Sequence, residues 1–185
     1  MSRHSKITRM DDWDVPTARP RLQGRSVPLC DMSPRTVMHR LGDLVYFSQF
    51  RRTKNGTPFN DIKCSYDIAR DFADVACEFI RHLVRNTDGW ALITTPRRRH
   101  ADGFHFATEV CKRIAEHFGM PFYAGAVQCI SCDRLNPDFH LLQPIAERLV
   151  IVYDDIITTG TTLTATASLL ADRDFVLNII GINNR

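Results

Sequence analysis

The sequence lacks the hallmarks of several protein classes. Its six cysteines in 185 residues are too few for a disulfide scaffold. No apolar run approaches the length of a membrane span, and the first residues hold no apolar signal core. It has no internal repeat, and its net charge of +3 is too small to indicate nucleic-acid binding. We therefore expect a cytoplasmic protein in a reducing setting, with neither a membrane nor a nucleic acid as its direct partner.

The remaining composition is that of an ordinary globular protein. Hydrophobic residues make up 44% and charged residues 24% of the chain, which is long enough for one domain with a sizeable core. Residues 1–36 differ, because they are polar, basic and rich in proline without sustained periodicity. We predict an irregular arm over 1–36 and a single domain over 37–185. The arm could wrap the core, or it could join a homodimer or a heteromeric complex.

Helical and extended patterns alternate along the predicted domain. Helical spacing of apolar residues, or a helix-like segment, occurs over 65–84, 106–118 and 163–171. Apolar segments typical of strands occur over 90–95, 121–127, 149–153 and 175–182. Residues 43–50 fit either a strand or a short helix, and 128–147 form a long polar connection. The alternation predicts right-handed βαβ crossovers in an α/β fold, with a mostly parallel twisted sheet in a three-layer α/β/α arrangement.

The string 150–162, Val-Ile-Val-Tyr-Asp-Asp-Ile-Ile-Thr-Thr-Gly-Thr-Thr, carries most of the functional signal. An apolar strand ends in Asp154 and Asp155, and a loop of small residues then leads into a helix. Backbone N–H groups, hydroxyls and a helix N-terminus suit a phosphate, while paired carboxylates can accept hydrogen bonds from ribose hydroxyls. Taken singly, each part would fit an ordinary strand, cap or loop. The complete string in order favours a phosphate–ribose site at the strand's C-terminal edge.

This string resembles the 5-phosphoribosyl-1-pyrophosphate (PRPP) signature of the type I phosphoribosyltransferases. That signature has four hydrophobic, two acidic and two hydrophobic residues before a Thr-Gly-x-Thr core, and no lysine follows the glycine as in a Walker loop. The resemblance implies the type I phosphoribosyltransferase fold with a short hood, and Mg²⁺ held mainly through PRPP. It implies Asp154 and Asp155 as catalytic residues on the ribose. It also implies a 5-phosphate loop made of Thr158, Thr159, Gly160, Thr161 and Thr162.

A second positive element is expected to face the pyrophosphate. Thr95, Pro96 and the arginines Arg97, Arg98 and Arg99 follow the predicted first strand and precede a helix. Guanidinium groups neutralise phosphates and donate forked hydrogen bonds to them. We predict that this segment is the pyrophosphate loop, with a solvated basic loop as the alternative.

The residues around that loop resemble the ComF-like branch of the family. Pro96, the basic loop, Gly103-Phe104 and an Ala-rich helix follow in the same order. The zinc ribbon found in many ComF-like proteins is absent, because residues 1–40 contain only Cys30. Asp102 and His105 replace the arginine and asparagine that often flank Gly-Phe.

One position bears on the substrate, and two further segments bear on ligands. Hypoxanthine-guanine enzymes carry a carboxylate where this chain has Thr158, so orotate, uracil, adenine or an unusual acceptor is favoured.

Residues 128–147 correspond to the mobile loop of the family, in which Arg134 and His140 would contact phosphate or simply be solvated. Cys129 and Cys132 form a CxxC that could bind metal or be an ordinary pair; no second CxxC exists to complete a zinc site.

Two functions follow from these patterns. The first is an enzyme that binds PRPP with Mg²⁺ and transfers the phosphoribosyl group to a nucleobase-like or other nitrogen acceptor, with release of pyrophosphate. The second is a module of the same fold that binds PRPP or a nucleotide without salvage activity. Such a module would act as a regulator, or as an effector or partner subunit of a larger complex, for example in phage defence. The basic arm, the short hood and Thr158 favour the second function.

Overall fold

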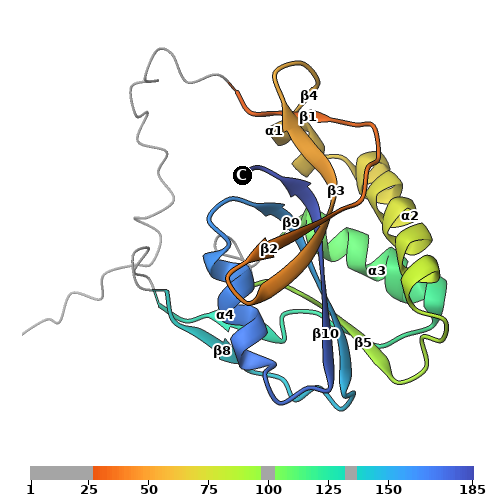
Figure 1. Ribbon diagram of the computed structural model, residues 1–185, viewed down its shortest axis with the longest axis vertical. Coiled ribbons are helices and arrows are strands. Elements are labelled where there is room, and N and C mark those ends of the chain that lie inside the picture. Colours follow the sequence, from red (N-terminus) through yellow and green to blue (C-terminus); the bar gives the residue numbers. More distant parts are fainter. Residues whose placement is uncertain (1–26, 97–102, 132–136) are drawn as a thin grey trace, which may run out of the picture.

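A mixed sheet of eight strands organises the chain in the computed structural model, which describes residues 27–96, 103–131 and 137–185 (Figure 1). The sheet strands are β1 (Leu29–Asp31), β2 (Val37–Leu41), β3 (Leu44–Thr53), β4 (Thr57–Pro58), β5 (Trp90–Thr94), β6 (Phe122–Tyr123), β9 (Leu149–Ile157) and β10 (Phe175–Asn183). The helices are α1 (Phe59–Lys63), α2 (Tyr66–Leu83), α3 (Phe106–Phe118) and α4 (Thr161–Leu169). Strands β7 (Val127–Cys129) and β8 (Phe139–Leu141) pair in a separate antiparallel hairpin.

The sheet has a parallel part and an antiparallel part. Its order is β4-β1-β3-β10-β9-β5-β6, and β2 also pairs with β3. All neighbours from β3 to β6 are parallel, whereas β1, β2 and β4 pair in antiparallel fashion. The mostly parallel α/β sheet predicted from the sequence is therefore confirmed. The expected short hood corresponds to the antiparallel strands together with α1, which follows β4.

Helices cover both faces of this sheet, because strands such as β9 carry apolar side chains on both faces. Side chains alternate along a strand, so Val150 and Val152 pack on one face with Leu163 of α4. Ile151 and Tyr153 belong to the opposite cluster, with the buried faces of α2 and α3. A strand segment covered on both faces is apolar, as Leu149–Val152 of β9 and Trp90–Ile93 of the fully buried β5 are. The three-layer arrangement is thus confirmed.

The two long helices agree with the periodicity of the sequence. Helix α2 buries Ala69, Phe72, Ala73, Ala76 and Ile80 on one side. The Ser65 hydroxyl caps its N-terminus by accepting a hydrogen bond from the backbone N–H of Ile68 at 3.2 Å. Helix α3 ends at Gly119, whose φ of 65° is the left-handed conformation that terminates many helices.

Several predicted boundaries differ from the structure. Residues 121–127 are not one strand, because a turn with Gly125 at a φ of 72° separates β6 from β7. The polar connection 128–147 contains most of the β7–β8 hairpin. The strand predicted over 149–153 continues to Ile157, because β10 keeps pairing with it as far as Asn183. The ambiguous segment 43–50 belongs to a strand, β3.

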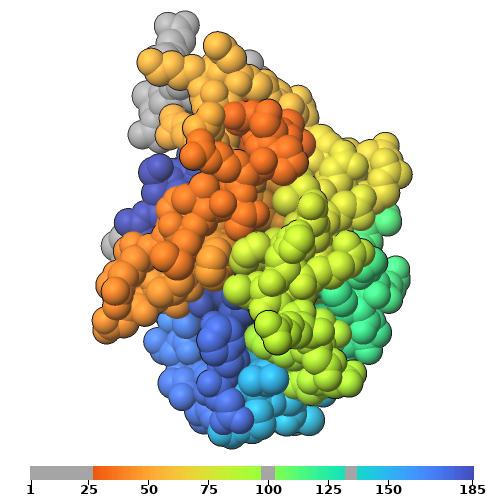
Figure 2. Space-filling model, turned by 45° about the vertical axis from the view of Figure 1, so that its right-hand side comes forward, coloured from red at the N-terminus to blue at the C-terminus, as the bar shows by residue number. Residues whose placement is uncertain are grey.

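The N-terminal part of the described chain is joined to the sheet. Residues 29–31, placed in the irregular arm by the sequence, form β1, because their backbone groups pair with both β3 and β4. Residues 1–26 of the predicted arm lie outside the described residues, so the proposed division at residue 36 stays a prediction. In Figure 2 the segment that follows them (orange) forms the upper and left-hand edge, and the C-terminal segment (blue) forms the lower left. No helix in the described ranges is long and apolar enough to cross a membrane.

Candidate functional site

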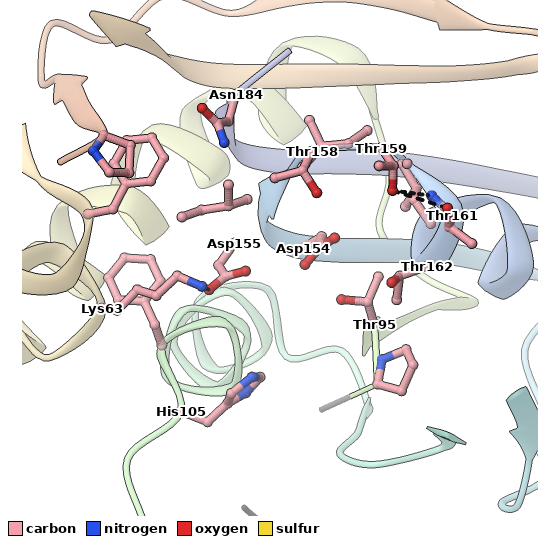
Figure 3. A pocket seen from close by; sticks show the side chains of 18 of the residues that line it. Lys63, Thr95, His105, Asp154, Asp155, Thr158, Thr159, Thr161, Thr162 and Asn184 are labelled. Carbon is pink, nitrogen blue, oxygen red and sulfur yellow. Dashed lines mark hydrogen bonds and ion pairs between the residues drawn. The ribbon is translucent and has the colours of Figure 1, made fainter. Parts of the chain in front are cut away.

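A cavity of about 650 Å³ opens where β5 and β9 end and α4 begins. Its wall includes both acidic residues of the sequence string and the loop that follows them (Figure 3). Other parts of the wall come from the residue before β1, from α1, and from the start of α3 with the two residues before it. The described residues that line it and that the sequence did not assign to the site include Pro28, Phe59, Asn60, Lys63, Phe104, His105 and Asn184.

The acidic pair lies within β9, beyond the point where β5 ends. The last pair between these strands is Thr94 with Tyr153, so Asp154 and Asp155 have no β5 residue beside them. Thr95 then closes this edge, since its backbone N–H donates to the Tyr153 carbonyl at 3.1 Å. The early end of β5 leaves space in front of the two carboxylates, which is the cavity.

Asp154 lies in the centre of the cavity between two groups of polar residues (Figure 3). Burial and the neighbouring charge of Asp155 raise the pKa of Asp154 to about 7. A hydrogen bond from the Thr95 side chain and the charge of Lys63 oppose that rise in pKa. Near neutral pH this carboxyl group can therefore exist with or without its proton.

Asp155 has a cation as its immediate neighbour. Its Oδ2 atom is 2.7 Å from Nζ of Lys63, the last residue of α1. The Asp155 side chain is 17% exposed and that of Lys63 is 44% exposed. Two adjacent carboxyl groups thus differ: one is paired with an ammonium group and the other with a hydroxyl.

The loop after the acidic pair is shaped by Gly160. This residue is the N-cap of α4 and has a φ of 86°, a conformation that favours glycine. A Cβ atom at Gly160 would also overlap the Leu41 side chain of β2. The first turn of α4 contains no acidic residue. No carboxylate of that turn therefore competes with an anion for the N-terminus of α4.

Contacts on both sides of Gly160 hold the loop in place. Oγ1 of Thr159 accepts a hydrogen bond from the backbone N–H of Thr161 at 3.4 Å and lies 3.1 Å from the Thr161 hydroxyl. The Arg185 guanidinium donates to the Thr159 carbonyl at 3.3 Å. Thr158 and Thr162 also line the cavity, so the structure brings the whole predicted phosphate loop together with the acidic pair.

The other predicted site residues lie partly on the cavity wall, partly away from it, and partly outside the described residues. Thr95 and Pro96 line the cavity and are buried. Arg97, Arg98, Arg99 and Arg134 lie outside the described residues. His140 is on β8, away from the cavity wall, and its Nε2 atom lies 3.0 Å from Asp138. Cys129 is a free thiol, and Cys132 lies outside the described residues.

The sequence did not indicate three polar residues of the cavity. Lys63 is far from the string along the chain, and no spacing connects them. His105 was noted only as a departure from the ComF-like pattern; in the structure its Nδ1 caps α3 by accepting from the Thr108 N–H at 3.3 Å. Asn184 follows β10, and its buried Oδ1 atom has no hydrogen-bond partner among the described residues.

The donor set fits a magnesium ion held chiefly by a ligand. No group of three or more His, Cys, Asp or Glu residues that could hold a metal occurs within residues 27–96, 103–131 and 137–185. Asp154 and Asp155 nevertheless offer carboxylate oxygens in a cavity. Mg²⁺ is commonly bound by one or two carboxylates together with phosphates of a substrate.

No family model matches the sequence, and no curated protein sequence matches it. Among solved structures, a hypoxanthine-guanine phosphoribosyltransferase from Bacillus anthracis is similar, with 12% identity, 65% of this chain and 72% of that chain covered, and a TM-score of 0.46. A hypoxanthine phosphoribosyltransferase from Trypanosoma cruzi has 14% identity, with 65% and 62% covered and a TM-score of 0.43. A xanthine-guanine-hypoxanthine phosphoribosyltransferase from Helicobacter pylori has 14% identity, with 64% and 88% covered and a TM-score of 0.42. Similarity of this extent carries no conclusion about activity or substrate, and the ComF-like branch stays a prediction.

Proposed function

We propose that the chain binds PRPP with Mg²⁺ and transfers its phosphoribosyl group to a nitrogen nucleophile, releasing pyrophosphate. The observation that carries the proposal is the placement of an acidic pair and a helix N-terminus on one cavity. A phosphorylated ribose needs both elements, one for its phosphate and one for its vicinal hydroxyls. The resemblance of residues 150–162 to the PRPP signature points to the same ligand.

The 5-phosphate would bind at the loop from Thr158 to Thr162. The N-terminal turn of α4 supplies backbone N–H groups, and the threonines supply hydroxyls. Glycine suits position 160, because the Leu41 side chain occupies the space that a Cβ atom would need. A dianionic phosphate would also be favoured by the partial positive charge at the helix N-terminus.

The ribose would lie across the acidic pair, with its hydroxyls donating to Asp154 and Asp155. The negative charge of these side chains would favour the positive charge that develops at C1 as the pyrophosphate leaves. Mg²⁺, held by the pyrophosphate and these carboxylates, would supply neutralising charge to the leaving group. Positioning and electrostatics would account for most of the acceleration.

The leaving pyrophosphate and the acceptor would occupy the rest of the cavity. Thr95, Pro96 and the predicted loop Arg97–Arg99 would receive the pyrophosphate. The acceptor remains open among orotate, uracil, adenine and unusual nitrogen nucleophiles. Thr158 lacks a carboxylate that could take a proton from hypoxanthine or guanine.

The test is pyrophosphate release from PRPP and Mg²⁺ with each common nucleobase in turn. We expect turnover with at least one acceptor, and at least a hundredfold loss of kcat/KM in the variant that combines Asp154→Asn and Asp155→Asn. Asp71→Asn, on the exposed side of α2, is the matched control and should retain activity. PRPP binding without turnover across the panel would refute the transferase.

A second candidate is the binding module without salvage activity, and the Lys63–Asp155 ion pair favours it. A carboxylate already neutralised by an ammonium group stabilises a developing positive charge less well. In this alternative the chain would bind PRPP or a nucleotide and respond as a regulator or as a subunit of a larger complex. Co-purification of a partner that is lost when residues 1–26 are deleted, together with ligand binding without turnover, would support it.

A further inference from the structure

Among the described residues that line the cavity, Lys63 is the cation that forms an ion pair with the acidic pair, through Asp155. Its Nζ is 2.7 Å from Oδ2 of Asp155, and it lies on the opposite side of the cavity from the threonine loop, with Asp154 and Asp155 between them (Figure 3). A ligand whose phosphate occupies the loop and whose ribose spans the two carboxylates would extend its next group toward Lys63.

The backbone that carries Lys63 is fixed by its neighbours. Phe59 and Ile62 of α1 are buried, and the Phe59 N–H donates to the Pro28 carbonyl at 3.1 Å. Ser65, two residues later, accepts the capping hydrogen bond of α2. The lysine side chain, by contrast, is nearly half exposed and has four rotatable carbon–carbon bonds. Its ammonium group can therefore move within the cavity while its backbone stays in place.

The ion pair and a ribose hydroxyl compete for one carboxylate oxygen, Oδ2 of Asp155. Asp155 can accept hydroxyl hydrogen bonds fully only when Lys63 moves away from Oδ2. Such a move leaves an ammonium group without its partner carboxylate at the edge of the cavity. A ligand that offers a second anionic group at this point compensates for the broken contact, whereas a ligand that ends in a neutral hydroxyl does not.

We infer that Lys63 is a specificity-determining residue, which exchanges Asp155 for a second anionic group of the ligand on the C1 side of the ribose. This inference rests on the proposed function and narrows it. The site selects a ribose 5-phosphate that carries a diphosphate at C1 over ribose 5-phosphate itself. The ion pair lowers the affinity for sugars that lack this group, so an unreactive sugar phosphate does not occupy the two carboxylates.

The experiment compares the dissociation constants of PRPP and ribose 5-phosphate by calorimetry at one Mg²⁺ concentration. Lys63→Met removes the charge and Lys63→Arg retains it. Lys112→Met is the matched control, because Lys112 forms a similarly exposed ion pair with Glu109 at 2.8 Å on α3, outside the cavity. Thermal unfolding of each variant shows whether it remains folded.

The expected result is a change in the ratio of the two constants. Lys63→Met should weaken PRPP binding and leave ribose 5-phosphate binding equal or tighter, so that the preference for PRPP falls about tenfold or more. Lys63→Arg should retain most of the preference, and Lys112→Met should retain all of it. Equal weakening of both ligands, or an unchanged ratio, would overturn the inference while PRPP binding by the unaltered chain still supports the proposed function. Failure of that chain to bind PRPP would overturn both.

Discussion

Asp154 and Asp155 are neighbours in the sequence, yet their surroundings give them different chemistry. Asp155 has the Lys63 ammonium group at 2.7 Å. Asp154 has the Thr95 hydroxyl and the charge of Asp155 beside it, in a half-buried position. Because burial penalises the charged form, Asp154 keeps its proton to a higher pH than an ordinary aspartate does. Near neutral pH, Asp154 is therefore the carboxyl group of the site that can carry or release a proton.

The raised pKa of Asp154 predicts how stability depends on pH. The folded chain holds this proton up to about pH 7, while an unfolded aspartate loses it near its ordinary value of 3.8. Folding is therefore penalised by this group from about pH 4 upward, and fully above pH 7. We expect Asp154→Asn to raise the free energy of unfolding at pH 8 by at least about 1 kcal/mol, and to have little effect at pH 4. Urea unfolding at both pH values measures the difference.

The control for this titration is Asp71→Asn, because the Asp71 side chain is 59% exposed on α2. It should change stability by less than about 0.5 kcal/mol at either pH. An Asp154→Asn variant whose gain in stability is the same at pH 4 and pH 8 would contradict the assigned shift.

At the scale of elements, the site depends on where three segments end. Strand β5 stops at Thr94, β9 continues to Ile157, and α4 begins one residue after Gly160. The difference in strand length exposes the acidic pair, and the left-handed glycine turns the chain so that α4 presents its N-terminus to the same cavity. The β2–β3 hairpin contributes by placing Leu41 against Gly160.

Gly160→Ala is expected to disturb this arrangement in two ways. A φ of 86° costs a non-glycine residue about 1–2 kcal/mol, and the added methyl group would overlap Leu41. We expect a loss of about 1–3 kcal/mol in unfolding free energy, because the Leu41 methyl group lies at the end of a flexible side chain and can shift. PRPP affinity should also fall at least tenfold at a temperature where the variant is folded. Chemical unfolding and calorimetry test the two parts.

Gly89→Ala separates strain from overlap. Gly89 also has a left-handed φ, 76°, but a Cβ atom there would meet nothing within 4 Å. This variant should lose about 1 kcal/mol of stability and keep its ligand affinity. Equal effects of the two substitutions on stability would show that the contact with Leu41 is unimportant.

The sequence predicts correctly those elements whose residue pattern lies within the element itself. The spacing of Phe72, Ala76 and Ile80 predicts α2, because one buried face repeats every three or four residues. The apolar run of β5 predicts a strand covered on both faces. The string 150–162 predicts strand, loop and helix together, and the structure places its acidic residues and threonines on one cavity.

The remaining elements depend on distant partners. Strand β1 has three residues and exists because β3 and β4 lie on either side of it. Strand β9 continues past its acidic pair because β10 does. Lys63 reaches Asp155 only through the packing of α1, so no spacing in the sequence could indicate the ion pair.

At the scale of the whole molecule, the cavity is lined by segments from both the parallel and the antiparallel part of the chain. The acidic pair belongs to β9, the predicted phosphate loop leads from β9 into α4, Thr95 follows β5, and Lys63 comes from α1 beside the antiparallel strands. A ligand that touches all of these segments must lose its contacts when any one of them unfolds. Binding should therefore stabilise the fold as one unit.

PRPP with Mg²⁺ is accordingly expected to raise the midpoint of thermal unfolding. A ligand at a hundred times its dissociation constant adds about 2.7 kcal/mol to the unfolding free energy. For a chain of this size that corresponds to roughly 5–10 °C. The variant with Asp154→Asn and Asp155→Asn should show less than half of this shift, since it lacks the ribose acceptors, and Asp71→Asn should show all of it. Differential scanning calorimetry over a range of PRPP concentrations makes the measurement. A midpoint that is independent of PRPP concentration in the unaltered chain would contradict a PRPP site at this cavity.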